Sequence, residues 1–401
     1  MSYFNIAIYI LEFFFLVIFI HPIVVAFMVL LVRRSPTKKL NTLKQKFAII
    51  IPSYREGNVL VHNIDSLKKQ NYPVDRFKIF LINDNCDSAV IEQLRNSNVK
   101  IIDVSFPKSS KVKSLQSAYT HVGDKFDSVI VIDSDNLAHP NFLKEINLSL
   151  ANGSVFVQGK RIAKNLDSLH SRLDYLTDIF YNFIDREWLN HLNLSATISG
   201  SGFGMERKLF FDVINKIDVF GGFDKMIQLI LIKNGYKIDF NPDAIIYDEK
   251  VSESGEMRKQ RKRWIHAHMR MIATHTQDIL KSIVKKITID KLNYLFIILR
   301  PPLTILVFIA IFFCVFNIFL KFHTIAFIWT GILFAYFLIL LTTLILSKVD
   351  LKMYLVLLAS PLLLLNQLLS IFNIKEAAQN SLHTSHSSVL TINDILSKEK
   401  K

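Results

Sequence analysis

Two short groups of side chains in this sequence are suited to chemistry on a phosphorylated ligand. Asp133-Ser134-Asp135 follows an apolar run and places two carboxylates on alternate residues, where both can reach one site. Such a pair suits a hard divalent cation that also binds phosphate oxygens. Gln260, Arg263 and Trp264 are spaced i, i+3 and i+4, so one helical face carries an amide, a guanidinium and an indole. The guanidinium can pair with phosphate, and the flat indole can stack on a sugar ring.

Each group also has a purely structural interpretation. An Asp-x-Asp sequence is common by chance in solvated turns, but the position of this one directly after Val129–Ile132 favours a site at a strand end. Arg and Trp are common on a basic amphipathic helix at a membrane interface, and Gln260–Trp264 fits that description as well. The two interpretations of Gln260–Trp264 are compatible.

Two further aspartates stand where a binding or catalytic carboxylate is useful. Asp84 ends the apolar run Lys78–Asn83, where it either accepts hydrogen bonds from a ribose or base edge or serves as an ordinary turn residue. Asp224 opens the helical stretch Lys225–Lys233, where it is either a helix cap or a general base that removes a hydroxyl proton. Backbone amides at a helix start would keep such a base ionised at neutral pH.

Lysines and glycines add weaker signals. Lys111 and Lys113 begin a helical stretch, and either can reach a phosphate, although a solvated lysine is the default. No Gly-x-Gly-x-x-Gly or phosphate-binding glycine loop follows the first apolar run, so dinucleotide and P-loop folds lose support. The glycine-rich segment Ser199–Gly204 lies late and follows no clear first strand.

The elements that must position these residues alternate between short apolar runs and amphipathic stretches. The apolar runs are Phe47–Pro52, Lys78–Asn83, Lys100–Val104 and Val129–Asp133. The stretches with helical spacing between them are Asn58–Gln70, Ala89–Asn96 and Lys113–Val122. This alternation predicts an α/β domain with a mainly parallel sheet that helices cover on both faces. Ligands of such sheets bind beyond the carboxyl ends of the strands, which is where the polar residues stand in this chain.

The two ends of the chain predict membrane-spanning helices. Hydrophobic residues make up 51% of the chain, more than a soluble globule usually carries, and the excess lies at the ends. Residues 1–32 form one long apolar stretch. The region 293–374 contains three further candidates, Leu303–Leu320, Thr324–Ser347 and Met353–Phe372. Between them lies a domain of ordinary composition, 46–276, with an interface helix at about 256–272, and residues 375–401 form a polar tail that we expect to be loosely ordered.

The net charge of +14 is placed for a membrane rather than for nucleic acid. Basic clusters flank the apolar segments, and each cation near an anionic lipid surface gains about 1 kcal/mol. The cluster after the first span, Arg33 to Lys46, contains no acidic residue, which predicts a cytoplasmic middle domain in an integral membrane protein. Cys86 and Cys314 are the only cysteines, so neither a disulfide framework nor a zinc site is expected.

Taken together, the motifs resemble the inverting family 2 glycosyltransferases. More narrowly, they are similar to the membrane-embedded branch that includes cellulose, hyaluronan and poly-N-acetylglucosamine synthases. The residues that carry the resemblance are, in order, Pro52-Ser53-Tyr54-Arg55-Glu56, Asp84, Asp133-Ser134-Asp135, Asp224 and Gln260-x-x-Arg263-Trp264. The resemblance implies a GT-A-type (Rossmann-like) domain, Mg²⁺ or Mn²⁺ as cofactor, a UDP-sugar donor and a carbohydrate or lipid-linked acceptor.

The resemblance also implies a role for each motif. The residues that would bind the donor nucleotide are Pro52, Ser53, Tyr54, Glu56, Asp84, Asp133 and Lys111, with Lys113 as the alternative lysine. Asp135, together with Asp133, would ligate the metal, and Asp224 would be the catalytic base. The residues on the acceptor and pyrophosphate side would be Ser201, Gly202, Gln260, Arg263 and Trp264.

Two positions depart from the family pattern. Ser110 replaces the glycine that normally precedes the family lysine at Lys111. Gly222-Phe223-Asp224 stands where the family usually has Glu-Asp or Thr-Glu-Asp, so Asp224 is retained without its acidic neighbour. We therefore expect the family's reaction type in this chain, but not the family's usual acceptor specificity.

These expectations describe a membrane-bound enzyme that joins glucose or N-acetylglucosamine to a growing polysaccharide or another membrane-associated acceptor through a β-glycosidic bond. A processive enzyme with so few spans would dimerise or recruit partner subunits for export. Two alternatives stay open. One is the addition of a single sugar to a lipid, as in glucosylceramide synthase, and the other is a non-catalytic transporter or scaffold with a nucleotide-binding domain.

Overall fold

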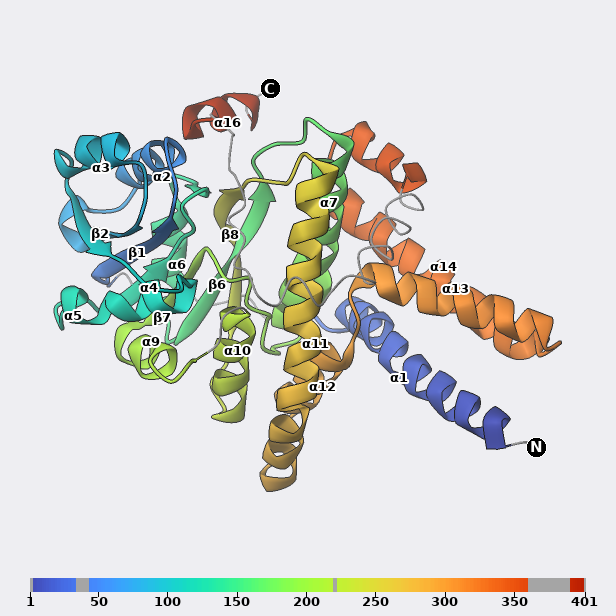
Figure 1. The fold of residues 1–401 in the computed structure, drawn as a ribbon. Coiled ribbons are helices and arrows are strands. Elements are labelled where there is room, and N and C mark those ends of the chain that lie inside the picture. The colour runs from blue at the N-terminus through green and yellow to red at the C-terminus, as the bar shows by residue number, and fades with distance from the viewer. Residues whose placement is uncertain (1–2, 34–42, 219–221, 360–389, 400–401) are drawn as a thin grey trace.

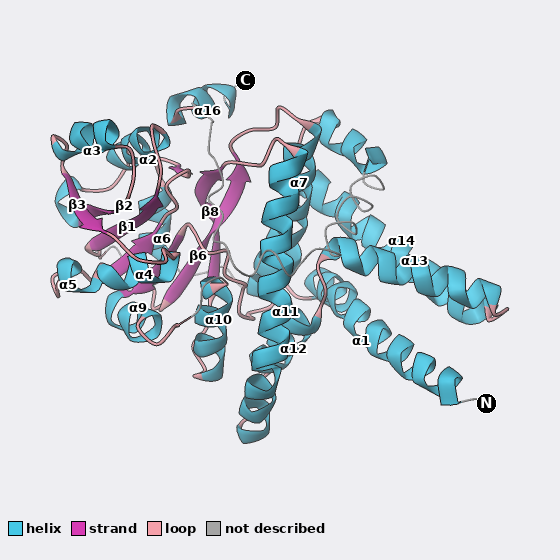
Figure 2. Ribbon diagram, in the orientation of Figure 1, coloured by secondary structure: helices cyan, strands magenta, loops and turns pink. Residues whose placement is uncertain are grey.

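A computed structural model describes residues 3–33, 43–218, 222–359 and 390–399. Within these ranges eight strands form one sheet in the order β3-β2-β1-β4-β7-β6-β8-β5 (Figures 1 and 2). The strands are β1 (Phe47–Tyr54), β2 (Phe77–Asp84), β3 (Val99–Val104), β4 (Ser128–Val131), β5 (Leu137–Ala138), β6 (Phe156–Ala163), β7 (Phe203–Glu206) and β8 (Asp239–Asp248). The four predicted apolar runs are therefore strands β1 to β4.

The sheet is parallel in its first half and mixed in its second. Strands β3, β2, β1 and β4 run parallel to one another, as do β6 and β8. Strand β7 runs antiparallel to both of its neighbours, β4 and β6, and β5 runs antiparallel to β8. The expected α/β class with a mainly parallel sheet is confirmed, and the antiparallel pairs lie in the second half of the sheet.

Alternate residues of the central strand face two separate cores. Phe47, Ile49 and Ile51 of β1 pack under α2 (Val59–Lys68), α3 (Ser88–Arg95) and α6 (Phe142–Ala151). Ala48 and Ile50 pack on the other face, under α4 (Lys111–Ser117), α5 (Tyr119–Val122), α9 (Arg207–Ile214) and α10 (Phe223–Lys233). Because both faces are covered, the strands read as continuous apolar runs in the sequence.

Two long helical segments flank the second half of the sheet. Helix α7 (Leu169–Asn182) continues through a π-helical turn, Phe183–Glu187, into α8 (Trp188–His191). Helix α11 (Ser254–Lys285) contains 32 residues, so it is longer than the predicted interface helix, and it lies beside α7 (Figure 1). Helix α12 (Ile289–Leu299) packs along α11.

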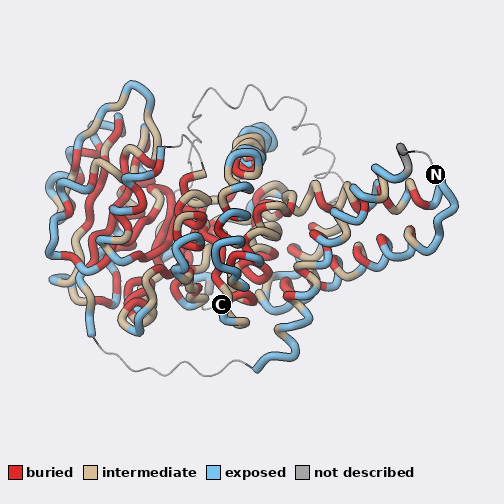
Figure 3. The backbone as a smooth tube through the Cα atoms, turned by 90° about the horizontal axis from the view of Figure 1, so that it is seen from below, coloured by how far each residue is buried: buried red, intermediate tan, exposed pale blue. Residues whose placement is uncertain are grey.

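Three apolar helices project together from the domain: α1 (Tyr3–Leu31), α13 (Leu303–Phe319) and α14 (His323–Leu346) (Figures 1 and 3). In the described part of the chain, two helices are long and apolar enough to cross a membrane, and a third crossing is added if α12 and α13, bent by 74°, count as one span. Inside this bundle the Glu12 carboxylate accepts hydrogen bonds from Asn317 at 2.7 Å and from the Trp329 indole at 2.5 Å. This buried acid is therefore held by polar partners from two other helices.

The C-terminal part of the chain differs from the sequence expectation. Of the third apolar candidate, Met353–Phe372, the residues after 359 lie outside the described part, and residues 351–359 are helical. Within the expected polar tail, Ile392–Glu399 forms helix α16, which packs against α2 of the domain. Ile392 and Ile395 are buried there, so this part of the tail is ordered because it has an apolar face to cover.

Candidate active site

The expected site residues gather where the carboxyl ends of β2, β1 and β4 lie side by side. Tyr54 at the end of β1 pairs in register with Asp84 at the end of β2. Asp133 follows β4 by two residues, and β4 is the other neighbour of β1. The three polar strand ends that were expected to share one edge of the sheet therefore do so.

Asp84 is fully buried and has one carboxylate oxygen to spare. Asn85 donates its amide to Oδ1 at 2.8 Å, and the backbone N–H of Arg55 donates to the Asp84 carbonyl at 3.1 Å. Oδ2 is buried and has no hydrogen-bond partner among the described residues. Since an unmet acceptor at such depth is costly, a ligand N–H or O–H would be bound well here.

The loop after β1 joins Asp84 to the carboxylate pair. Ser53 is buried, and the Arg55 guanidinium lies over the Tyr54 ring at 5.1 Å from its centroid. Pro52 is part of β1 and pairs with Ile82 of β2. Glu56 is buried, and its Oε1 accepts a hydrogen bond from Ser134 Oγ at 3.1 Å. The first loop is thus tied to the loop that carries Asp133 and Asp135.

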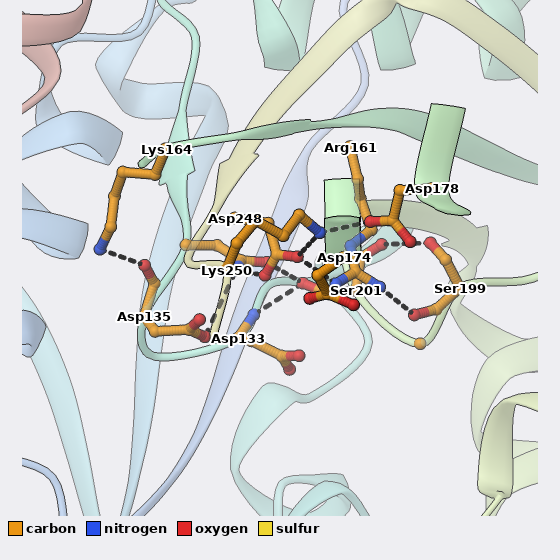
Figure 4. Close-up of polar contacts among 12 residues, drawn as sticks. Asp133, Asp135, Arg161, Lys164, Asp174, Asp178, Ser199, Ser201, Asp248 and Lys250 are labelled. Atoms are coloured by element: carbon orange, nitrogen blue, oxygen red, sulfur yellow. Dashed lines mark hydrogen bonds and ion pairs between the residues drawn. The ribbon is translucent and has the colours of Figure 1, made fainter. Parts of the chain in front are cut away.

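Asp133 and Asp135 stand in different surroundings (Figure 4). Asp133 is partly exposed, and its carboxylate pairs with the Lys111 ammonium. Asp135 is buried, its Oδ1 accepts from the Asn136 amide at 3.3 Å, and its carbonyl accepts from Lys164 Nζ at 3.1 Å. The exposed and the buried carboxylate lie on one short loop beyond the sheet.

The residues present fit a divalent cation that shares its coordination with a ligand. Two carboxylates on one loop are hard oxygen donors of the kind that Mg²⁺ and Mn²⁺ accept. No group of three or more His, Cys, Asp or Glu side chains in the described ranges could hold an ion without further help. Phosphate oxygens and water would therefore have to complete the coordination, as is usual for Mg²⁺ sites that bind nucleotides.

Lys111 reaches the centre of the site, whereas Lys113 does not. Besides pairing with Asp133, Lys111 Nζ donates to the Gly200 carbonyl at 2.8 Å and lies 4.9 Å from the centroid of the Phe223 ring. Lys113 Nζ donates to the Lys108 carbonyl at 3.1 Å, within its own loop. The difference arises because Ser110 caps the helix and Lys111 is its first residue.

The turn before β7 brings a second set of residues to the carboxylate loop. The backbone N–H of Asp133 donates to Ser201 Oγ at 2.9 Å, and Ser201 Oγ donates to Asn136 Oδ1 at 2.5 Å. Gly202 has φ of +65°, and a Cβ at this position would lie 2.3 Å from Ile246 Cδ1. Only glycine fits this close approach between the turn and β8.

Asp224 lies in the first turn of α10, next to the same turn. Gly222 precedes the helix in the left-handed region, with φ of +73°. A Cβ on Gly200 would lie 3.7 Å from Asp224 Cβ, so the two backbones are close. Burial lowers the pKa of Lys225, and the negative charge of Asp224 acts in the opposite direction. Asp224 itself is half-buried, in reach of solvent and of the turn at Gly200.

Helix α11 brings Gln260, Arg263 and Trp264 to the neighbourhood of α10. Lys225 Nζ lies 2.7 Å from His268 Nδ1, and the three residues stand on the turns of α11 just before this contact. Gln260 Oε1 is buried without a hydrogen-bond partner among the described residues. Burial lowers the pKa of Arg263, and Trp264 is 42% exposed. An amide oxygen and an indole face are therefore presented for a ligand.

A buried charge network behind the carboxylate loop was missed from the sequence (Figure 4). Asp248 at the end of β8 accepts from the Asn136 amide at 3.0 Å and from Lys250 Nζ at 2.7 Å, and it pairs with Arg161. Burial would raise the pKa of Asp248, but Arg161 and Lys250 outweigh it and hold this pKa well below its usual range. Arg161 also donates to the Ser199 carbonyl at 3.2 Å. The network thus joins the carboxylate loop to the turn before β7.

The network extends to α7 and α11. Lys250 pairs with Asp178 of α7, and Arg261 Nη2 of α11 lies 2.5 Å from Asp174 Oδ1. Asp174 and Asp178 are spaced i, i+4, and Asp248 follows the apolar run Ala244–Tyr247. That last feature is the signal that identified Asp84 and Asp133, and it could have identified Asp248 as well.

Comparisons with known proteins find a matching family and several relatives of this domain. The model of the family described as "Glycosyltransferase like family 2" matches residues 44–267. "Probable glycosyltransferase YdaM" of Bacillus subtilis is 22% identical over 63% of this chain and 62% of its own length. The hyaluronan synthase of Streptococcus pyogenes is 30% identical over 34% of each chain. This chain therefore spans less than two thirds of the length of both relatives.

A solved structure shares the fold over nearly the whole chain. The mannosyltransferase PcManGT from Pyrobaculum calidifontis, in complex with GDP-Man and Mn²⁺, superposes with a TM-score of 0.53 at 14% identity. The match covers 90% of this chain and 94% of that one. At this identity the likeness concerns the fold alone.

Proposed function

This chain belongs to glycosyltransferase family 2, and we propose that it transfers glucose or N-acetylglucosamine from a UDP-sugar to a polysaccharide or another membrane-associated acceptor. The observation that carries the proposal is the position of Lys111. Its ammonium joins Asp133 on the donor side to the Gly200 carbonyl on the acceptor side, and it lies over Phe223, next to Asp224. The Lys111 ammonium therefore links the proposed donor side, acceptor side and catalytic base of the site.

The donor nucleotide would lie along the carboxyl ends of β1, β2 and β4. The free oxygen of Asp84 would accept from the nucleobase or ribose, with Tyr54 and Glu56 lining the same loop. Asp133 and Asp135 would hold Mg²⁺ or Mn²⁺, which supplies neutralisation of the diphosphate charge. Lys111 would exchange part of its pairing with Asp133 for a phosphate oxygen when the donor binds.

Asp224 would act as the general base for a single displacement. It would take the proton from the acceptor hydroxyl while that oxygen forms a bond to the anomeric carbon. The bond from this carbon to the diphosphate oxygen breaks, and UDP leaves with the electron pair. One displacement inverts the anomeric carbon, so an α-linked donor gives a β-linked product. A base of this kind contributes about 10²–10⁴-fold to the rate.

The side chains of α11 would close the site from the acceptor side. Arg263 would pair with the departing diphosphate, and the exposed face of Trp264 would stack on the acceptor sugar. Gln260 would use its unmet Oε1 to accept from a sugar hydroxyl. Ser201 and Gly202 would shape the floor of the acceptor site beneath these residues.

Helices α1, α13 and α14 would anchor the enzyme in a membrane, with the catalytic domain on the cytoplasmic side. The basic residues that directly follow α1 support this orientation. Addition of one sugar to a membrane lipid is the second candidate function. It is favoured by the sequence, because the four or so apolar spans that the sequence predicts are few for a wide export channel.

The proposal is tested by incubating membranes that contain the protein with radiolabelled UDP-glucose, UDP-N-acetylglucosamine and GDP-mannose, and then sizing the product. We expect transfer from a UDP-sugar, and the product length separates a polysaccharide from a single addition. Asp224→Asn should abolish transfer while the variant still binds UDP. Normal turnover by Asp224→Asn, or a preference for GDP-mannose, would overturn this assignment.

A further inference from the structure

The C-terminal helix α16 (Ile392–Glu399) covers the edge of the sheet next to the candidate site. Ile392 and Ile395 are 1% and 8% exposed, and they form one apolar cluster with Leu137 of β5 and Tyr247 of β8. Figure 1 shows α16 above α2 and β8, away from the free ends of α1 and α13. The apolar side of this short helix is therefore buried against the domain.

Polar contacts fix the start and the position of α16. Asp394 Oδ2 accepts from the N–H of Thr391 at 2.8 Å and from its hydroxyl at 2.6 Å, which closes the first turn. Lys69, just beyond α2, donates to Asn393 Oδ1 at 3.2 Å. The helix thus has its own cap and a polar contact with the domain in addition to its apolar contact.

The two residues beneath α16 are direct neighbours of two site residues. Leu137 follows Asn136, which donates to Asp135 and Asp248 and accepts from Ser201. Tyr247 precedes Asp248. A shift of β5 or β8 would therefore move the residues that hold the carboxylate loop. Supporting residues of this kind orient metal ligands and tune them.

The chain also returns to the domain before it reaches α16. Helices α13 and α14 pack together as an antiparallel pair joined at Leu320–Phe322. Beyond α14, Met353 and Val356 belong to the same apolar cluster as Tyr175 and Leu176 of α7. If α13 carries the chain across a membrane, α14 brings it back.

From these observations we propose that α16 docks in cis on the catalytic domain, places the C-terminus on the catalytic side of the membrane and supports the β5–β8 edge. The orientation part rests on the membrane anchoring proposed above. It requires an even number of crossings after the domain, supplied by α13 and α14. This even number differs from the sequence expectation of three C-terminal spans.

Sidedness is tested by labelling single cysteines with a membrane-impermeant maleimide, in a protein whose Cys86 and Cys314 are replaced by serine. Asp75→Cys marks the catalytic domain, His323→Cys marks the α13–α14 turn, and Lys398→Cys reports α16. We expect Lys398→Cys to label from the same side as Asp75→Cys and from the side opposite to His323→Cys. Labelling of Lys398→Cys together with His323→Cys would overturn the proposal, whatever the enzyme's activity.

The supporting role is tested by the double variant Ile392→Asp/Ile395→Asp and by truncation after residue 389, with Lys398→Asp as the matched control on the exposed side of α16. The affinity for UDP in the presence of Mn²⁺, measured by titration calorimetry, should fall by roughly tenfold in both test variants and stay unchanged in the control. Unchanged affinity in both test variants would overturn the supporting role. Because this readout is binding, it stands apart from the transfer assay of Asp224→Asn.

Discussion

The ammonium of Lys225 lies 2.7 Å from Nδ1 of His268, and Nε2 of the same ring lies 3.0 Å from the carbonyl oxygen of Arg300. The ring therefore accepts at Nδ1 and donates at Nε2, which requires the neutral form. Arg300 in turn pairs with Asp185 at 2.5 Å. The helix that begins with the candidate base is thus linked to the bend between α12 and α13.

This link makes stability depend on pH through His268. Burial lowers the pKa of His268 to about 3, and the charges of Lys225 and Arg300 act in the same direction. Below the ordinary pKa of 6.5 the unfolded chain binds a proton that the folded chain does not, so stability falls as the pH drops toward 3, by about 1.4 kcal/mol per pH unit. Thermal unfolding in detergent at pH 7 and pH 5 measures this loss.

His268→Gln should reduce the pH dependence, since a glutamine has no proton to bind in this range. His266→Gln, on the same helix, should keep the dependence of the parent protein. If the stability of His268→Gln depends on pH as steeply as that of the parent protein, another group is responsible for the dependence.

Lys111 and Lys113 form a matched pair for donor binding. Lys111→Met should weaken UDP-sugar binding by about 1.5–3 kcal/mol, the usual range for a hydrogen bond to a charged group. Lys113→Met should leave binding unchanged, because this side chain bonds the Lys108 carbonyl in its own loop. Titration calorimetry compares the affinities of the two variants for UDP. Equal losses of binding free energy would show that the two lysines do not differ in donor binding.

Removal of the proposed metal ligand Asp135 should abolish the effect of metal on nucleotide binding. Asp135→Asn keeps the shape of the side chain and loses its charge, so UDP should bind it equally well in Mn²⁺ and in EDTA. The exposed Asp243→Asn should still respond to Mn²⁺. A full Mn²⁺ response in Asp135→Asn would place the ion elsewhere.

Alanine substitutions at two glycines distinguish the cost of backbone strain from the cost of steric overlap. Gly123 combines φ of +66° with ψ of −177°, a conformation essentially restricted to glycine, and has open space around it, so Gly123→Ala should cost only backbone strain, about 1–3 kcal/mol. Gly202→Ala meets Ile246 Cδ1 at 2.3 Å and should cost about 1–3 kcal/mol more. Ile246→Val removes that methyl and should recover part of the additional loss in thermal unfolding.

The pair Arg261–Asp174 should contribute to stability only while both charges are present. Both side chains are buried, so Asp174→Asn or Arg261→Met leaves one charge without compensation, at a cost of about 3–5 kcal/mol. The double variant Asp174→Leu/Arg261→Met should be more stable than either single change. Lys259→Met breaks an exposed pair with Glu256 and should cost less than about 1 kcal/mol.

Much of the first half of the domain could be predicted from local sequence. Strands β1 to β4 are apolar runs that end at polar residues, and the parallel order of β2, β1 and β4 brings Asp84 and Asp133 to one edge. Strands β5 to β8 were not predicted. β5 has two residues, and β6 carries Gln158, Lys160 and Arg161, so neither gives an apolar run.

Within the candidate site, contacts between side chains that are distant in sequence could not be predicted either. The sequence identified Lys111 and Lys113 together, because the choice between them depends on where Gly200 and Phe223 lie in space. The charge network of Arg161, Asp248 and Lys250 depends on pairing between β6 and β8 over more than 80 residues of chain. Local periodicity carries no information on such pairing.

The antiparallel pairing of β4 with β7 makes the contact between two loops of the site depend on strand register. Val131 pairs with Phe203, so Asp133 stands two residues beyond this pair on one strand and Ser201 two residues before it on the other. The ladder sets how these two residues meet, and β6 supports the turn, since the Gln158 amide donates to the Ser201 carbonyl at 2.9 Å. The intervening chain, 137–198, is not independent of this meeting point, because its Gln158 and Arg161 donate to the turn and its Lys164 donates to the Asp135 carbonyl. A change in the length of a loop in that segment is therefore tolerated only where β6 and β7 keep their pairing.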